Sequence, residues 1–283
     1  MPVRRIDEVD VQDMKDPLAA VDFVKYIYKA YRSTEQKVRI SSTYMSRQQD
    51  INEKMRSILI DWLVDVHLKF KLVPETLYLT VNLIDRFLMV KSVSRKHLQL
   101  VGVTAMLVAS KYEEIWAPEV RDFVYISDRA YNRDQILNME KIMLNSLKFN
   151  LTVPTHYHFL HRFLKVAGLA ENAEAVNYAT YLVELALPEY STLRFRYSQV
   201  AAAAVYATMI VYEAPYDANR QVHLHSTYSS EDLLDCIELL SDLYTRAPTA
   251  SLTAVHKKFS SERMHNVASR GPPSVNVDSP MEF

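Results

Sequence analysis

Helical periodicity extends over most of the chain, and it comes in two blocks. Apolar residues recur every three to four positions, which places them on one face of a helix, and no convincing strand-like alternation interrupts them. Helical stretches in the first block lie near 52–72, 75–90, 94–114, 118–126 and 133–148. Those in the second block, which begins after Pro154, lie near 155–167, 173–187, 197–213, 230–246 and 249–259. The sequence therefore predicts an all-α protein built from two five-helix bundles in tandem.

Polar segments mark the boundaries of these blocks. The first residues are charged and lack a sustained period, and the last residues are also polar. After Pro17, apolar and aromatic residues cover about half of one helix, which predicts an N-terminal helix before the first bundle. We assign 1–16 to a flexible leader, 17–46 to the N-terminal helix and a linker, 47–152 to the first bundle, 153–259 to the second bundle and 260–283 to a disordered tail.

Few residues suit a nucleotide-binding enzyme or a metal site. The chain has only three glycines, far apart, whereas a phosphate-binding loop needs several close together. Cys236 is the only cysteine, which excludes an intramolecular disulfide and a cysteine zinc cluster. His156, His158 and His161 miss the i, i+4 spacing that brings two histidines together on a helix. We therefore predict neither a cofactor nor a metal.

Charge and hydropathy restrict the partners. The formal net charge of −1 argues against nucleic acid as the main ligand, because phosphate contacts require an excess of basic side chains. No uninterrupted apolar run is long enough to span a bilayer, and the N-terminus lacks the apolar core of a signal peptide. We expect a location in the nucleus and the cytoplasm, without membrane contact.

Four short motifs follow one another in the first block. They are Met-Arg-Ser-Ile-Leu from Met55, Glu-Thr-Leu-Tyr-Leu-Thr from Glu75, Leu-Gln-Leu-Val-Gly from Leu98 and Ala-Ser-Lys-Tyr-Glu-Glu from Ala109. This order and spacing strongly resembles the cyclin box. The wording is most similar to the mitotic B-type cyclins, because Tyr112 stands where A-type relatives favour phenylalanine. The resemblance implies two tandem five-helix cyclin boxes. It also implies a regulatory subunit, not an enzyme, which binds a cyclin-dependent kinase one-to-one and activates it at the G2/M transition.

The helix expected near 52–72 has two apolar faces. Taken alone, this pattern favours a central core helix, although Arg56, Asp61 and Asp65 predict a partly polar rim. The resemblance implies instead a shallow docking groove for Arg-x-Leu segments of substrates and inhibitors. The residues that it implies are Met55, Ile58, Leu59 and Trp62 for the apolar floor, Asp65 for the basic side chain of the peptide and Gln99 for its backbone.

A second surface is implied by the last motif and the helix near 133–148. Taken alone, Lys111 is a solvated lysine at a helix C-terminus, where the helix dipole favours cations, and Glu140 is a surface carboxylate. In cyclins the matching lysine and glutamate are paired contacts to the kinase, among apolar residues that pack on its C-helix. The kinase-binding residues implied in this way are Phe23, Ile27, Tyr28, Lys111, Tyr112, Glu140, Leu144, Phe149 and Leu151.

Alternatives to this hypothesis are an A-type cyclin, a transcription adaptor of the same fold that binds DNA and polymerase, and an enzyme built on a helical bundle. The near-neutral charge disfavours the adaptor. The enzyme lacks a recognisable nucleophile, base and orienting group. Ser279 precedes the only proline that follows a serine or threonine, so it is a candidate site for a proline-directed kinase.

Overall fold

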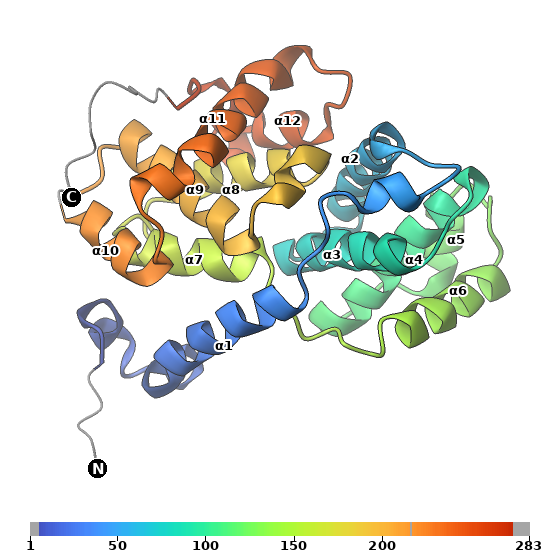
Figure 1. Cartoon of the computed structure of the whole chain (residues 1–283), viewed down its shortest axis with the longest axis horizontal. Helices are drawn as coiled ribbons and strands as arrows, with labels where there is room; N and C mark the ends of the chain where they lie inside the picture. Colours follow the sequence, from blue (N-terminus) through green and yellow to red (C-terminus); the bar gives the residue numbers. More distant parts are fainter. Residues whose placement is uncertain (1–5, 216, 274–283) are drawn as a thin grey trace.

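The computed structural model describes residues 6–215 and 217–273. Over these residues the chain is helical and contains no β-strand, which confirms the all-α prediction. Two helical bundles lie side by side. Helix α1 (Val24–Lys37) runs along the lower edge of the molecule beside α7 (His156–Val166) (Figure 1). No helix in the described part of the chain is long and apolar enough to cross a membrane. The candidate Ser279 lies outside the described residues.

The first bundle is organised around one central helix. Its helices are α2 (Glu53–Phe70), α3 (Pro74–Val90), α4 (Arg95–Glu113), α5 (Val120–Ile126) and α6 (Arg133–Ser146). In α4, residues 100–110 are all buried, because the other helices of the bundle surround them. An N-cap fixes the start of α6: the Asn132 side chain accepts a hydrogen bond from the Gln135 backbone N–H at 2.9 Å.

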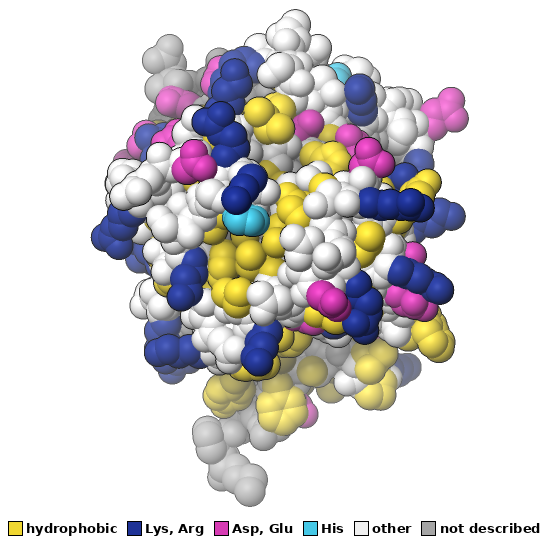
Figure 2. Space-filling model, turned by 90° about the vertical axis from the view of Figure 1, so that its right-hand side faces the viewer, with side chains coloured by type: hydrophobic (Ala, Val, Ile, Leu, Met, Phe, Trp, Pro, Cys, Tyr) yellow, Lys and Arg dark blue, Asp and Glu magenta, His cyan; other side chains and the backbone are white. Residues whose placement is uncertain are grey.

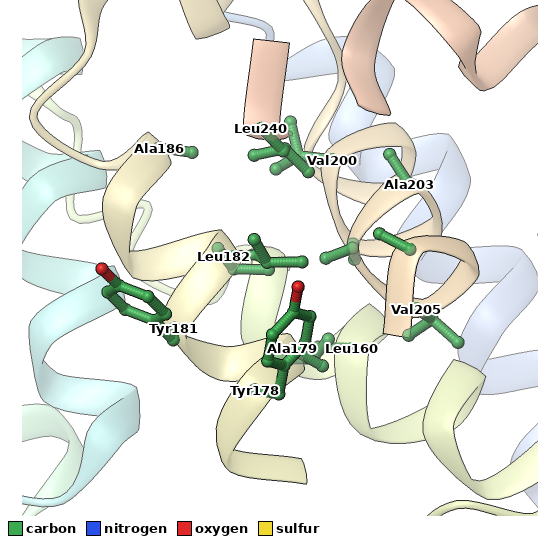
Figure 3. Close-up of a cluster of buried hydrophobic side chains, with 14 of the residues drawn as sticks. Leu160, Tyr178, Ala179, Tyr181, Leu182, Ala186, Val200, Ala203, Val205 and Leu240 are labelled. Atoms are coloured by element: carbon green, nitrogen blue, oxygen red, sulfur yellow. The ribbon is translucent and has the colours of Figure 1, made fainter. Parts of the chain in front are cut away.

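The second bundle has α9 at its centre. Its helices are α7 (His156–Val166), α8 (Ala173–Ala186), α9 (Tyr197–Val211), α10 (Ala218–Ser226), α11 (Ser230–Arg246) and α12 (Ala254–Phe259). Residues 201–204 of α9 are four fully buried alanines, whose small side chains let the neighbouring helices approach closely. Figure 3 shows Leu182 and Leu240 directed toward α9 from two sides.

Helix α10 was not expected from the sequence, where no helical stretch is predicted between 213 and 230. The segment is mostly polar, so its periodicity is weak, and its buried stripe consists of Ala218, Val222 and Ser226, at 2%, 0% and 0% exposure. Burial of this narrow i, i+4 stripe against α7 and α9 therefore stabilises the helix, rather than its intrinsic propensity.

The predicted leader (1–16) and tail (260–283) do not match the structure where it describes them. Glu8–Asp13 forms a 3₁₀ helix in which Asp10 is 2% exposed. Val267 is fully buried, and its carbonyl accepts a hydrogen bond from the Tyr244 hydroxyl at 2.8 Å. Both segments are ordered by contacts with residues distant in the sequence, which local composition does not reveal. The N-terminal helix also begins later than Pro17, after two short 3₁₀ turns.

A buried ion pair lies at the junction of the bundles. Arg56 of α2 is 1% exposed, and its Nε and Nη2 donate to the two carboxylate oxygens of Asp85 at 2.6 and 2.7 Å. Its Nη1 donates to the carbonyls of Leu187 and Pro188 at the end of α8, at 3.1 and 3.2 Å. Burial alone would lower the pKa of Arg56, but Asp85 raises it above its usual range. The prediction that Arg56 forms part of a partly polar rim was wrong, because Asp85 and two backbone carbonyls bind its guanidinium in the interior.

Candidate interaction surfaces

A groove of about 270 Å³ lies between α2 and the first turns of α4. The residues that line it are Met55, Ile58, Leu59, Trp62, Arg95, Leu98 and Gln99. Five of the six residues predicted for peptide docking therefore line one groove. Ile58 is 48% exposed, so the apolar floor is accessible to a partner. Asp65 does not line the groove; it is exposed on α2, one turn beyond Trp62.

Gly102 of α4 supports the floor of this groove. A Cβ atom at this position would lie 2.7 Å from Cδ1 of Leu59, closer than side chains tolerate. The missing side chain therefore provides the space in which Leu59 sits, at 5% exposure. Arg95, which sequence reasoning missed, lies at the start of α4 and adds a positive charge to the groove. Its place three residues before Leu98, one helical turn from the motif, was the available signal.

Lys111 and Glu140 lie together on a second surface. The Lys111 ammonium contacts both carboxylate oxygens of Glu140, at 2.7 and 3.0 Å, so the end of α4 is linked to the middle of α6. Their side chains are 47% and 14% exposed. The structure therefore brings together the two residues that the sequence predicted as a pair.

Apolar side chains surround this ion pair. Tyr112 and Phe149 are 44% and 65% exposed, whereas Leu144 and Leu151 are partly buried against the core of the first bundle. Exposed apolar side chains such as Tyr112 and Phe149, with charges beside them, are typical of an interaction surface. On the face at the first-bundle end of the molecule, Figure 2 shows a further group of hydrophobic side chains in a hollow beside a histidine, among Lys and Arg.

The loop after α4 contributes two residues that sequence reasoning missed. Ile115 and Trp116 are 91% and 90% exposed, the highest values for large apolar side chains in this bundle. Glu114 fixes the start of the loop, since its carboxylate accepts hydrogen bonds from the Val73 backbone N–H at 2.8 Å and the Thr76 hydroxyl at 2.6 Å. The signal in the sequence was two large apolar residues directly after paired glutamates, outside any helical period.

Helix α1 presents only part of the predicted set. Phe23 is 55% exposed and Ile27 is partly buried. Tyr28 differs from the prediction, because its hydroxyl donates to the His158 carbonyl at 3.0 Å and the Arg162 guanidinium lies 5.6 Å from its ring centroid. Burial raises the pKa of Tyr28 to about 12. Tyr28 therefore anchors α1 to the second bundle, while Tyr26, which was not predicted, is 63% exposed.

The three histidines of α7 have contacts that do not involve a metal. His156 packs on the Tyr197 ring with centroids 4.4 Å apart, and His161 packs on Tyr157 at 4.3 Å. His158 accepts a hydrogen bond from the Thr155 backbone N–H at 3.2 Å through Nδ1 and so caps the helix. Among the described residues, no group of three or more potential ligand side chains could hold a metal ion.

The fold defines an all-α protein of two tandem bundles, with exposed apolar and charged side chains gathered on its surface. Residues 26–152 match the family described as "Cyclin, N-terminal domain", and residues 154–273 match "Cyclin, C-terminal domain". The chain belongs to the cyclin family.

Its curated relatives include B-type cyclins, which confirms the resemblance to that type. A G2/mitotic-specific cyclin-1 of Medicago sativa subsp. varia is 46% identical over 272 residues, which cover 96% of this chain and 63% of that protein. Cyclin-B2-1 of Oryza sativa subsp. japonica is 48% identical over 272 residues, with 96% and 64% covered. The chain thus spans slightly less than two thirds of these relatives.

Solved structures share the fold at low sequence identity. A viral cyclin from herpesvirus saimiri has a TM-score of 0.71 at 17% identity, covering 81% of this chain and 99% of that one. A chain of the yeast RNA Pol II CTD kinase CTDK-1 complex has a TM-score of 0.57 at 15% identity, with 89% and 85% covered. At this identity the similarity establishes the fold alone.

Proposed function

We propose that this chain is the regulatory subunit of a cyclin-dependent protein kinase that acts at the G2/M transition. The observation that carries the proposal is the Lys111–Glu140 pair, set among exposed Tyr112, Phe149 and Trp116 at the end of the first bundle. The relatives named as G2/mitotic-specific and B-type cyclins support the stage of the cell cycle. A role as a regulatory protein, not a catalyst, agrees with this family.

The mechanism follows from what a kinase needs. A protein kinase is active when its C-helix is turned inward, so that a glutamate on that helix pairs with the lysine that holds the ATP phosphates. An apolar surface that covers the outer side of the C-helix shifts this two-state element toward the active position. Tyr112, Phe149, Ile115 and Trp116 provide exposed apolar area for that contact. The charged pair beside them sets the register of the two proteins.

The groove on α2 and α4 is proposed to bind Arg-x-Leu segments of substrates and inhibitors. A leucine side chain fully buried on its apolar floor contributes roughly 1.5–3 kcal/mol. In this proposal Asp65, which is exposed one turn beyond the groove, binds the arginine of such a peptide. A contribution of this size suits a weak, exchangeable recruitment site, distinct from the more extensive kinase contact.

The test is reconstitution with a monomeric cyclin-dependent kinase already phosphorylated on its activation loop. We expect a one-to-one complex by size exclusion, and a large rise in phosphorylation of a Ser-Pro peptide when the chain is added. A Lys111→Ala, Glu140→Ala variant controls for the proposed surface and is expected to lose both effects. A folded wild-type chain that forms no complex with any such kinase would refute the proposed function.

A further inference from the structure

Helix α1 is continuous in sequence with the first bundle, but its charged side chains Arg32 and Glu35 form hydrogen bonds with the second. We propose that Arg32 and Glu35 are positioning residues, which fix α1 on the second bundle in the orientation that presents Phe23 and Tyr26 to the kinase. This inference rests on the proposed function. The inference gives the second bundle a role in kinase binding, although none of the predicted kinase-binding residues lies in that bundle.

Glu35 binds the first turn of α9. It is 5% exposed, and its carboxylate oxygens accept hydrogen bonds from the backbone N–H and the hydroxyl of Ser198, at 2.7 and 2.8 Å. The first backbone N–H groups of a helix lack partners within the helix, and the dipole there favours a negative charge. Glu35 therefore caps a helix that lies 163 residues further along the chain.

Arg32 makes the opposite contact, at the C-terminus of α10. Its guanidinium donates to the His225 carbonyl at 2.8 Å, to the Thr227 hydroxyl at 2.9 Å and to the Ser226 carbonyl. The last carbonyls of a helix lack partners within the helix, and the dipole there favours a positive charge. Arg32 and Glu35 lie one turn apart on α1. Each binds a helix end whose partial charge is opposite to its own: Glu35 binds the positive N-terminus of α9, and Arg32 binds the negative C-terminus of α10.

A third contact restrains the other half of α1. Arg162 of α7, which lies over the Tyr28 ring, donates to Asp10 at 2.6 Å, and Lys165 donates to Asp10 at 2.7 Å. Asp10 is buried in the N-terminal 3₁₀ helix, so this segment closes over the contact. The helix is thus attached to the second bundle near both of its ends.

Geometry makes this attachment relevant to binding. Without the Arg32 and Glu35 contacts, the Tyr28 contact with the second bundle becomes the pivot of α1, and at a rise of about 1.5 Å per residue Phe23 lies roughly 8 Å from it along the helix axis. A tilt of about 10° about Tyr28 would move Phe23 by about 1 Å, and a gap of about 1 Å already loses up to about half of the dispersion attraction to a partner. Loss of the Arg32 and Glu35 contacts would leave the helix α1 folded, but its exposed side chains would no longer have the orientation that fits the kinase.

The experiment uses the full chain and an activated cyclin-dependent kinase, with Kd measured by biolayer interferometry. We expect Glu35→Ala and Arg32→Ala each to raise the kinase Kd about tenfold, the effect of losing one buried charged hydrogen bond. Glu35→Gln retains an oxygen that accepts from Ser198 and should restore most of the affinity. Gln36→Ala, an exposed position on the same helix, is the matched control and should have no effect.

Two further readouts separate positioning from loss of fold. Affinity for an isolated Arg-x-Leu peptide reports on the first bundle and should stay unchanged in Glu35→Ala. In a double-mutant cycle with Tyr26→Ala, the Glu35→Ala effect should shrink, because it acts through the contact that Tyr26 makes. Ser198→Ala tests the same hydrogen bond from the second bundle.

The outcomes distinguish the two proposals. A wild-type chain that binds no kinase overturns the proposed function, and this inference with it. Kinase binding that is unaffected by Glu35→Ala, Arg32→Ala and Ser198→Ala overturns the positioning role alone. Equal loss of kinase and peptide affinity also overturns it, because that result indicates a general loss of structure. Full additivity with Tyr26→Ala overturns it as well, because it shows that Glu35 does not act through the contact of Tyr26.

Discussion

Gly102→Ala is expected to close the docking groove while leaving the kinase surface intact. The added Cβ would lie 2.7 Å from Cδ1 of Leu59 and 3.2 Å from its Cγ and Cδ2, whereas ordinary contacts begin at 3.4 Å. Leu59 must therefore move away from α4. Since Leu59 forms part of the groove floor, its displaced side chain would occupy space that a peptide leucine needs.

The size of the effect follows from burial. Exclusion of one leucine side chain removes about 1.5–3 kcal/mol, which corresponds to a rise of about 10- to 150-fold in the peptide Kd. The fold should survive, because overpacking costs about 1–3 kcal/mol and replacing a helical glycine by alanine returns about 0.5–1 kcal/mol. Lys111 and Glu140 do not touch Gly102 or Leu59, so the kinase Kd should not change.

The assay is fluorescence polarisation with a labelled Arg-x-Leu peptide, beside a kinase-binding titration and urea unfolding of the same protein. Leu59→Val combined with Gly102→Ala provides the rescue, because valine lacks the Cδ atoms that make the closest contact. A folded Gly102→Ala protein whose peptide Kd stays within about twofold of the wild type would refute the reasoning. Loss of kinase and peptide binding together would show that the substitution disrupts the bundle.

Further predictions concern charged groups. Lys111→Ala with Glu140→Ala should change the free energy of unfolding by less than about 1 kcal/mol, because the Lys111 side chain is half exposed. The same double variant should raise the kinase Kd, measured by calorimetry, by more than about tenfold. Unchanged kinase affinity would contradict the assigned surface. Asp85→Asn leaves the buried Arg56 guanidinium without its anion, so urea unfolding should show a loss of about 3–5 kcal/mol, and wild-type stability would contradict this. Burial lowers the pKa of His67 to about 4. The unfolded state therefore binds the proton of His67 more tightly than the folded state. As the pH is lowered from 7 to 5, the free energy of unfolding should fall by about 2 kcal/mol. His67→Gln should remove that part of the pH dependence, which urea unfolding at both pH values would measure.

Periodicity predicted the long helices because their apolar faces are wide, whereas the resemblance to cyclins implied which residues would share a surface. The resemblance named Lys111 and Glu140 together as kinase contacts, and the two side chains contact each other in the structure; their contact with a kinase stays a prediction. What the sequence did not reveal depends on contacts between distant segments. From its sequence context Asp10 would be a solvated carboxylate in a charged leader. In the structure it is buried and bound by Arg162, which lies more than 150 residues further along the chain. The same holds for α10, whose narrow apolar stripe gains its stability from α7 and α9.

Helix α2 is a central core helix and also lines a groove, which explains why periodicity alone could not choose between the two interpretations; peptide docking in the groove stays a prediction. Leu63 and Val66 pack in the core of the first bundle, whereas Ile60 and Val64 pack with the helices of the second. Ile58 remains exposed in the groove. A helix between two bundles must be apolar on both buried sides, which leaves only one narrow face for a partner. The buried ion pair of Arg56 holds that helix at the junction, so the groove is built on one of the most constrained elements of the fold.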